Sequence, residues 1–374
     1  MMIKKAYKNK ELSLLGMGAM RLPLIDGGKD KDIDYEKASE IIDHCMKNGI
    51  NYYDTAHVYH GGGFSEKFLG DVMKKYPRDS YNLATKYNIG AEKDYKKCFE
   101  SQLERLQTDH IDFYLIHCIL DNNMQEYIDS GAVDYFIEQQ KAGRITYLGF
   151  SSHASTQTLE KFASLRQWDF AQIQLNYFDW MYGSTKKEYE ILESRNIPII
   201  AMESVRGGRL AKLTPDAEKL LKDAHPDWSI ASWAFRWLMR LPSLMVSLSG
   251  MSTLEQAVDN VKTFENLSPL TDDEEKLLFK ACELFHEQVQ VPCTACRYCT
   301  DGCPVQINIP EILKVYNNFK LQGPWALHGL KGVKSEGKVT DCVQCGACTG
   351  HCPQSIDVPK IMAEMSKALE GFGK

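Results

Sequence analysis

The stretch that decides the fold is residues 36–54, EKASEIIDHCMKNGINYYD. Its apolar residues recur at helical spacing and form one face, made of Ala38, Ile41, Ile42, Cys45 and Met46. Gly49 closes this helix, predicted over 36–48, because glycine readily adopts the left-handed conformation that follows a last helical turn. The apolar run Ile50–Asp54 comes next and predicts a buried strand. The stretch is therefore one helix-to-strand unit of an α/β fold.

The same alternation of short apolar runs and amphipathic stretches continues from Leu14 to Met251. It contains eight strand candidates: Leu14–Gly18, Ile50–Asp54, Asn82–Lys86, Phe113–His117, Thr146–Ser151, Ala171–Leu175, Ile197–Met202 and Met245–Ser249. Eight strand–helix units over about 250 residues are typical of a (β/α)8 TIM barrel. We assign residues 1–288 to this barrel.

Polar residues stand where the predicted strands end. Asp54, Lys86, His117 and Ser151 end the second to fifth strands, and Gln172 lies within the sixth. Any one of them alone is explained as a solvated or satisfied polar residue at a strand end. Parallel barrel strands, however, all end at the same face, where barrel enzymes carry their active sites. The set together predicts an active site at that face.

Eight of the twelve cysteines form two runs near the C-terminal end of the chain. The runs are Cys293, Cys296, Cys299 and Cys303 before Pro304, and Cys342, Cys345, Cys348 and Cys352 before Pro353. This spacing is that of bacterial ferredoxins, in which the fourth cysteine of each run binds the other cluster. The alternative is a pair of zinc sites, but zinc usually takes two separated cysteine pairs.

The cysteine runs therefore predict two 4Fe-4S clusters in residues 289–374, with cross-ligation between the runs. One cluster would take Cys293, Cys296, Cys299 and Cys352, and the other Cys342, Cys345, Cys348 and Cys303. A helical pattern over 311–319 separates the runs, and another over 272–288 leads into them. The fold class is thus a TIM barrel followed by a small, mainly helical ferredoxin-like domain. The remaining cysteines, Cys45, Cys98, Cys118 and Cys282, are assigned no role.

Several short motifs of the barrel region follow each other at characteristic distances. They are Asn51–Tyr59 (NYYDTAHVY), Gly61–Gly63, Ser65–Glu66, Leu69–Gly70, Ala84–Lys86 (ATK) and Leu115–His117 (LIH). In this order they resemble the signature of the aldo-keto reductases, and the similarity extends from about Leu14 to Asn260. With the cysteine runs, the chain resembles an iron-sulfur-containing branch of that family. The resemblance implies reduction of an aldehyde or ketone, or the reverse oxidation, by hydride transfer with NAD(P)H.

The residue types of the implied catalytic tetrad suit this chemistry. A carbonyl that accepts a hydride needs a proton, and Tyr59 is the expected general acid. Lys86 would lower the pKa of the phenol from its ordinary value near 10, and Asp54 would keep the lysine charged and oriented. His117 would donate a hydrogen bond to the substrate oxygen. His57 and His60 flank Tyr59, but no third ligand at zinc spacing stands nearby.

The same resemblance implies which residues bind the cofactor. Ser151, Ser152 and Gln172 would hold the nicotinamide carboxamide, and the expected adenosine-phosphate residues are Gly250, Met251, Ser252, Gln256 and Asn260. Many members carry Lys and Arg for the 2′-phosphate where this chain has Gly250 and Gln256. We therefore expect NADP(H) with NAD(H) as an alternative, and Arg206 or Arg209 as candidates to supply the missing positive charge. Met202 stands where many members stack an aromatic ring on the nicotinamide.

Composition restricts the partners. A net charge of −6 over 374 residues, with mixed signs, gives no basic footprint for nucleic acid, and no apolar run has the length of a membrane span. We expect a cytoplasmic protein whose partners are a small carbonyl or alcohol and a ferredoxin or other redox protein.

Three hypotheses remain for the function of a barrel and a ferredoxin-like domain in one chain. In the first, a hydride-transferring reductase is linked by its clusters to a redox partner or to a substrate handled one electron at a time. In the second, the clusters of the same enzyme only stabilise or dock. In the third, the chain is a nicotinamide-binding redox sensor or scaffold with little turnover. A nicotinamide gives up two electrons and a cluster takes one, so direct exchange needs an intermediary such as a flavin, for which the sequence has no motif.

Overall fold

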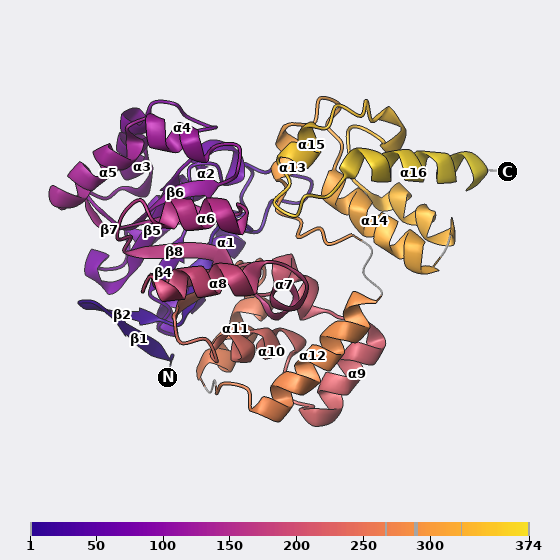
Figure 1. Cartoon of the computed structure of the whole chain (residues 1–374), viewed down its shortest axis with the longest axis horizontal. Coiled ribbons are helices and arrows are strands. Elements are labelled where there is room, and N and C mark those ends of the chain that lie inside the picture. Colours follow the sequence, from indigo (N-terminus) through magenta and orange to yellow (C-terminus); the bar gives the residue numbers. More distant parts are fainter. Residues whose placement is uncertain (1, 266–267, 288–290, 323, 373–374) are drawn as a thin grey trace. The chain divides into compact units, whose positions relative to one another are not determined.

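The computed structural model describes residues 2–265, 268–287, 291–322 and 324–372. The chain forms two compact units (Figure 1). The first contains residues 1–205 and 227–276, and the second contains residues 206–226 and 277–374. Residues 206–226 thus belong with the cysteine-rich segment, although they lie within the barrel region of the sequence. The boundary at residue 288 between the two sequence domains stays a prediction.

The first unit is built on a closed parallel barrel of eight strands in the order β10-β3-β4-β5-β6-β7-β8-β9. The strands are β3 (Leu15–Gly18), β4 (Tyr52–Asp54), β5 (Asn82–Tyr87), β6 (Ile111–Ile119), β7 (Ile145–Ser152), β8 (Phe170–Gln174), β9 (Ile199–Met202) and β10 (Leu244–Ser249). Each overlaps one of the eight predicted strands. The predicted TIM barrel is confirmed.

Helices connect and cover these strands. They are α1 (Tyr35–Lys47), α2 (His60–Met73), α3 (Tyr95–Leu106), α4 (Met124–Asp129), α5 (Ala132–Lys141), α6 (Thr156–Ala163), α7 (Tyr177–Tyr182), α8 (Thr185–Ser194), α10 (Ile230–Leu238) and α11 (Leu254–Glu265), with the 3-10 turn η1 (Arg78–Ser80). In α1 the Asp34 side chain caps the first turn by accepting from the Lys37 amide at 3.1 Å. Gly49 follows with φ of 86°, the left-handed conformation predicted for it.

A hairpin that the sequence pattern did not predict precedes the barrel. Strands β1 (Lys4–Tyr7) and β2 (Lys10–Ser13) pair antiparallel. Tyr7 and Leu12 are buried with barrel residues that include Phe113 and Tyr147, which lie near the beginnings of β6 and β7. The hairpin therefore packs at the end of the barrel where the strands begin. The opposite end, where the strands finish, holds the polar residues.

The second unit is mainly helical. It contains η2 (Arg206–Ala211), α9 (Pro215–Ala224), α13 (Tyr298–Asp301), α14 (Ile309–Gln322), η3 (Pro324–Gly332), η4 (Val339–Asp341), α15 (Ala347–Gly350) and α16 (Val358–Phe372). Helix α12 (Asp272–His286) is divided between the units at residue 276. Helices α12 and α14 lie where helical patterns were predicted, while residue 288 at the end of the first pattern is outside the described residues.

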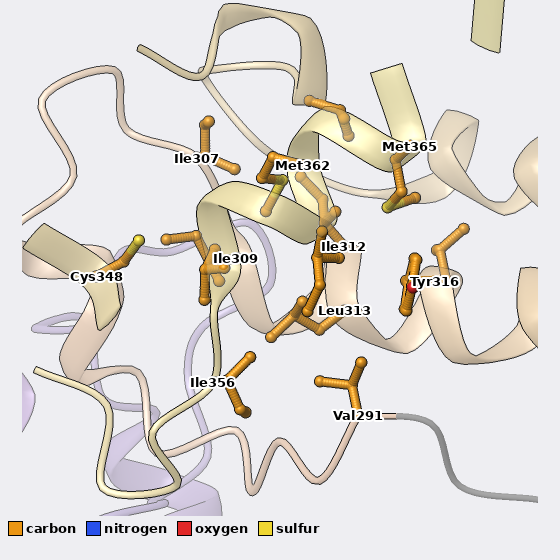
Figure 2. Close-up of a cluster of buried hydrophobic side chains, with 14 of the residues drawn as sticks. Val291, Ile307, Ile309, Ile312, Leu313, Tyr316, Cys348, Ile356, Met362 and Met365 are labelled. Carbon is orange, nitrogen blue, oxygen red and sulfur yellow. The ribbon is translucent and has the colours of Figure 1, made fainter. Parts of the chain in front are cut away.

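The core of the second unit lies between α14 and α16. Figure 2 shows Ile312 and Leu313 of α14 meeting Met362 and Met365 of α16, and all four side chains are buried. Ile356, just before α16, lies in the same cluster. A small apolar core of this kind holds both cysteine runs on a common scaffold. Among the described residues of the whole chain, no helix is long and apolar enough to span a bilayer.

Candidate active site and cysteine cavities

Three of the four predicted tetrad residues stand on adjacent barrel strands. Asp54 is the last residue of β4, Lys86 lies in β5 and His117 in β6. The ladder pairs Asp54 with Ala84 and Lys86 with Leu115, so the ends of these strands lie side by side. Tyr59 precedes the first residue of α2, in the loop that leaves β4. The barrel thus brings together residues that are up to 63 positions apart.

The four side chains form a connected, buried group. The Lys86 ammonium donates to Asp54 Oδ1 at 2.5 Å and to the Thr55 carbonyl at 2.6 Å, and its Nζ lies 3.5 Å from the Tyr59 hydroxyl oxygen. The Tyr59 and His117 rings meet edge to face, with centroids 5.9 Å apart. Lys86 is fully buried and the others are at most 8% exposed. The arrangement can hold one proton donor beside one fixed cation.

Burial sets the protonation states of this group. It raises the pKa of Tyr59 well above 10, with the Asp54 charge acting in the same direction. It lowers the pKa of Lys86, and the adjacent Asp54 carboxylate opposes that change. Lys86 was predicted to lower the pKa of Tyr59, but the net change is upward, because burial and the Asp54 charge both raise that pKa. Tyr59 is therefore a protonated phenol, the state an acid catalyst needs.

His117 is held as a neutral imidazole. Burial lowers its pKa well below 6.5, and the Lys86 charge acts in the same direction. The backbone carbonyl of His117 accepts a hydrogen bond from Tyr127 at 2.6 Å, which fixes this residue. Its Nδ1 is buried without a hydrogen-bond partner, as is Asp54 Oδ2. A neutral ring with one N–H can donate to a substrate oxygen without competing for the proton of Tyr59.

A second group of polar residues holds the backbone of Lys86, and no role was predicted for this group from the sequence. Glu66 is fully buried and accepts from the Gln102 amide at 2.8 Å and from Arg105 Nε at 2.8 Å. Gln102 also donates to the Lys86 carbonyl at 3.0 Å, and Arg105 Nη2 lies 3.0 Å from His57 Nδ1. Glu66 belongs to the signature quoted above, and so does Thr85, which also donates to it. Its other two partners, Gln102 and Arg105, come from α3, which that signature does not include.

The residues expected at the nicotinamide lie at the ends of β7 and β8. Ser151 and Gln172 face each other in the ladder, and with Ser152 all three are buried. Ser151 Oγ accepts from the Cys118 amide at 2.8 Å, and Ser152 Oγ accepts from the Ala154 amide at 3.2 Å. The Gln172 side-chain oxygen is buried without a partner. An orphaned amide oxygen at this position fits a carboxamide N–H of a bound nicotinamide.

The residues expected at the adenosine phosphates lie in the loop after β10 and in α11. Ser252 donates to the Arg21 carbonyl at 2.7 Å, and its amide donates to Gln256 at 2.8 Å. Asn260 donates to Ser249 Oγ at 2.9 Å. A Cβ built on Gly250 would lie 3.5 Å from the Arg21 Cβ.

Arg21 is therefore the basic residue beside this loop. Met251 of the expected set is buried in the same loop. Arg21 is partly exposed and pairs with Glu203 at 3.2 Å.

Arg206 and Arg209, the two arginines predicted as candidates for the 2′-phosphate, have partners within the second unit, to which they belong. Arg206 donates to the Pro292 carbonyl at 3.0 Å and to the Gln354 side chain at 2.9 Å. Arg209 donates to the Cys293 carbonyl at 3.0 Å. Both guanidinium groups are thus engaged by the cysteine-rich segment.

The eight clustered cysteines border two hollows within the second unit. One, of about 310 Å³, is lined by four of them: Cys293, Cys296, Cys299 and Cys352. The other, of about 340 Å³, is lined by Cys303, Cys342, Cys345 and Cys348. This grouping is the one that cross-ligation requires. No three potential ligands in the described residues close on a point suited to one metal ion, whereas a cubane needs thiolates spread around its corners.

The backbone around each hollow follows the same path. Positive φ angles recur at positions 49 residues apart: Ala295 and Gln344 (55° and 54°), Arg297 and Gly346 (69° and 76°), Gln306 and Ser355 (54° and 51°). Amides approach ligand sulfurs in the first run at 3.4 Å, from Ala295 to Cys293 and from Ile307 to Cys303. Non-glycine residues in this conformation cost roughly 1–2 kcal/mol each, so a repeated set marks a built site. The cysteines and amides fit a 4Fe-4S cluster in each hollow.

Fold and site together define a TIM-barrel oxidoreductase with an attached cysteine-rich unit. Comparison with known proteins identifies the family: residues 14–281 match the model of the aldo/keto reductase family, and residues 292–356 match that of the 4Fe-4S dicluster domain. The chain belongs to the aldo/keto reductase family and is an NAD(P)-dependent oxidoreductase.

Individual relatives support this assignment. The chain is 27% identical over 309 residues to the uncharacterized oxidoreductase YqkF of Bacillus subtilis, covering 74% of this chain and 94% of the relative. It is similar to the solved aldo-keto reductase AKR11C1 of Bacillus halodurans in its holo form, with 25% identity, a TM-score of 0.62 and coverage of 75% and 96%. A Klebsiella pneumoniae aldo-keto reductase in complex with NADPH shares the fold at 20% identity and a TM-score of 0.60, over 76% of this chain and 96% of that one.

Proposed function

We propose that this protein reduces an aldehyde or ketone with NADPH, with Tyr59 as proton donor, and that its second unit holds two 4Fe-4S clusters exchanging electrons with a redox partner. The observation that carries the proposal is the buried Asp54–Lys86–Tyr59 contact beside the neutral His117. The bound nicotinamide supplies the hydride. The chain's own residues supply orientation, exclusion of water and the proton.

The roles of the tetrad follow from its contacts. His117 donates to the carbonyl oxygen and orients it toward Tyr59. Tyr59 transfers its proton to that oxygen as negative charge develops, and the Lys86 ammonium 3.5 Å away stabilises the phenolate that remains. Asp54 and the Thr55 carbonyl hold the ammonium in place. Glu66, through Gln102, braces the backbone of the same lysine.

NADP(H) is the proposed cofactor. Gln172, Ser151 and Ser152 would hold the carboxamide, and the loop after β10 with Asn260 would hold the adenosine half. Arg21 lies beside Gly250 and supplies a cation where Gly250 and Gln256 carry none. The NADPH complex of the Klebsiella pneumoniae relative supports the same choice.

A redox partner is proposed from the surface of the second cysteine run. Cys345 is exposed, and Val343 beside it is 61% exposed, which is unusual for a large apolar residue next to a ligand. Electron transfer between proteins requires such an accessible edge. A ferredoxin or another one-electron carrier is the class of partner that fits.

The Tyr59→Phe variant tests the hydride function. It keeps the ring and its contacts but removes the transferable proton, so we expect turnover of aldehydes to fall by about 10²- to 10⁴-fold while NADPH binding persists. The matched control is Tyr87→Phe, because Tyr87 follows Lys86 but its hydroxyl donates to the Lys93 carbonyl at 3.3 Å, away from the tetrad. The measurements are NADPH consumption with a panel of aldehydes and NADPH affinity by fluorescence. Equal activity of both variants would contradict the role of Tyr59.

The Cys296→Ala and Cys345→Ala variants test whether the clusters transfer electrons or only stabilise the structure. Each removes one ligand from a different hollow. If the clusters link the barrel to a redox partner, we expect turnover that is driven by electrons from a reduced one-electron carrier to fall by at least about tenfold. Aldehyde reduction with NADPH in the first unit should continue. Cys282→Ala, which changes a buried cysteine outside both hollows, is the control. If the variants fold and lose the visible absorbance of the clusters but keep the turnover driven by the carrier, the clusters have only a structural role.

A further inference from the structure

The two cysteine runs are near-repeats in backbone path but not in their surroundings. In both, a one-turn helix carries the third cysteine, and a longer helix begins six residues after the fourth. Equivalent turns recur as well: the Gln306 amide donates to the Cys303 carbonyl and the Ser355 amide to the Cys352 carbonyl, each at 3.0 Å. Such a repeat alone would give two equivalent clusters.

Arginine contacts distinguish the first hollow from the second. Arg206 reaches Pro292, just before the first ligand, and Gln354, two residues after Cys352. Arg209 reaches the carbonyl of Cys293 itself. Cys293, Cys352 and Gln354 all line the first hollow, so the two arginines contact both of the chain segments that enclose it.

The corresponding positions of the second run have no such partners. Pro292 and Cys293 correspond to Asp341 and Cys342, and Asp341 instead accepts from the Lys338 amide at 2.8 Å. In the described part of the chain, no arginine or lysine side chain hydrogen-bonds to the carbonyls of these two residues. Cys345 in the second run is also exposed, whereas its counterpart Cys296 is partly buried. The first hollow is therefore the more cationic and the less solvated of the two.

The arginine turn is shaped for these contacts. Arg206, Gly207 and Gly208 have successive positive φ angles of 49°, 64° and 90°. Such a left-handed turn is costly for Arg206, which has a Cβ. Arg206 is only 2% exposed, so its charge is taken out of water and is held by the contacts above. A buried cation is screened far less than one at the surface.

We propose that Arg206 and Arg209 are positioning residues of the first cysteine hollow, and that they make the reduction potential of its cluster more positive than that of the second. This inference rests on the proposed presence of two clusters. A cluster with four thiolates is negatively charged and becomes more so on reduction, so a fixed cation stabilises the reduced state more than the oxidised one. The cluster in the hollow lined by Cys293 and Cys352 would therefore be the better electron acceptor of the two.

The test is a potentiometric titration of the anaerobic holoprotein followed by electron paramagnetic resonance. In Arg209→Gln we expect one midpoint potential to fall. The ratio of reduced to oxidised cluster at a given potential should decrease about tenfold, which is equivalent to about 59 mV for one electron. Arg209→Lys keeps the charge and should stay close to wild type. Lys338→Gln removes an exposed charge near the second run and should shift neither potential comparably.

The outcomes are distinct. A shift in Arg209→Gln that is confined to the cluster perturbed by Cys352→Ser, and that is absent in Arg209→Lys, supports the assignment. Unchanged potentials in Arg209→Gln, equal shifts of both, or the same shift in Arg209→Lys overturn it while leaving the proposed function intact. Iron and sulfide quantification that shows fewer than two clusters in the wild type overturns this inference and the cluster part of the proposed function.

Discussion

At the scale of single residues, burial decides the protonation of the candidate active site. Tyr59, Lys86 and His117 each have a neighbour whose charge the sequence identifies, but their pKa values shift in the direction that loss of solvation imposes. A protonated Tyr59 and a neutral His117 suit reduction, because the phenol gives its proton and the imidazole only donates a hydrogen bond.

The neutral His117 predicts a pH dependence of stability. Its pKa is lowered in the folded state, so below pH 6.5 the unfolded chain binds a proton that the folded chain does not. Its contribution to stability is full above pH 6.5 and is lost as the pH falls, at up to about 1.4 kcal/mol per pH unit. We expect His117→Asn to flatten the fall in melting temperature between about pH 7.5 and about pH 5.5.

If His117→Asn and wild type lose stability in parallel on acidification, His117 is not the buried neutral group described above.

At the scale of elements, the packing of α2 against α3 assembles the support for Lys86. Gly70 lies in α2, and a Cβ built on it would be 2.1 Å from the Arg105 backbone carbonyl oxygen of α3. Only glycine allows this approach, and α3 carries both Gln102 and Arg105 to Glu66. Leu69–Gly70 in the sequence signature thus has a packing reason distinct from the catalytic residues.

Gly70→Ala should therefore destabilise the barrel. Overpacking against a backbone atom costs about 1–3 kcal/mol or more, and we expect the melting temperature to fall by roughly 5–10 °C. The same displacement of α3 should reduce turnover by loosening Lys86. Gly332→Ala, where a Cβ meets nothing within 4 Å, is the control. Indistinguishable melting of the two variants would show that α3 moves aside at little cost.

Elements with strong local patterns were predictable from the sequence, and those defined by distant contacts were not. All eight barrel strands are short apolar runs between polar turns, and α1 has both a cap and a closing glycine. The hairpin β1–β2 has four-residue strands with mixed exposure, too short for a period to show.

The candidate site likewise has residues that the sequence predicts and contacts that it does not. Asp54, Lys86 and His117 end predicted strands, and such ends meet at one face of a barrel. Tyr59 lies in the loop after β4 and was predicted from the family resemblance. Two of the partners of Glu66 lie 36 and 39 residues away on another helix, and those of Arg206 and Arg209 lie 84 to 148 residues away. No local pattern encodes such contacts. The net pKa direction of Tyr59 depends on burial, which a motif does not report.

At the scale of the whole molecule, the open question is whether two-electron and one-electron chemistry are connected. The first unit contains the proposed hydride-transfer site, and the second contains the two cysteine hollows. Aldehyde reduction by NADPH is complete without the clusters, because hydride and proton account for both electrons. A connection between the units is therefore a separate property and needs a measurement of its own.

Optical titration of the anaerobic holoprotein with NADPH, and then with NADH, makes that measurement. With no flavin motif in the sequence to divide the hydride, we expect NADPH alone to bleach the cluster absorbance slowly or not at all, whereas a reduced one-electron carrier bleaches it within mixing time. Tyr59→Phe should not alter the bleaching by the carrier, because Tyr59 acts on protons. Rapid, stoichiometric bleaching by NADPH would contradict this expectation and show an internal route, and the nucleotide that acts faster would identify the preferred cofactor.

Since the arginine turn distinguishes the two hollows, the order in which the two cluster signals change during the carrier titration tells which hollow holds the first electron at equilibrium. The proposed potentials require that to be the hollow lined by Cys293 and Cys352.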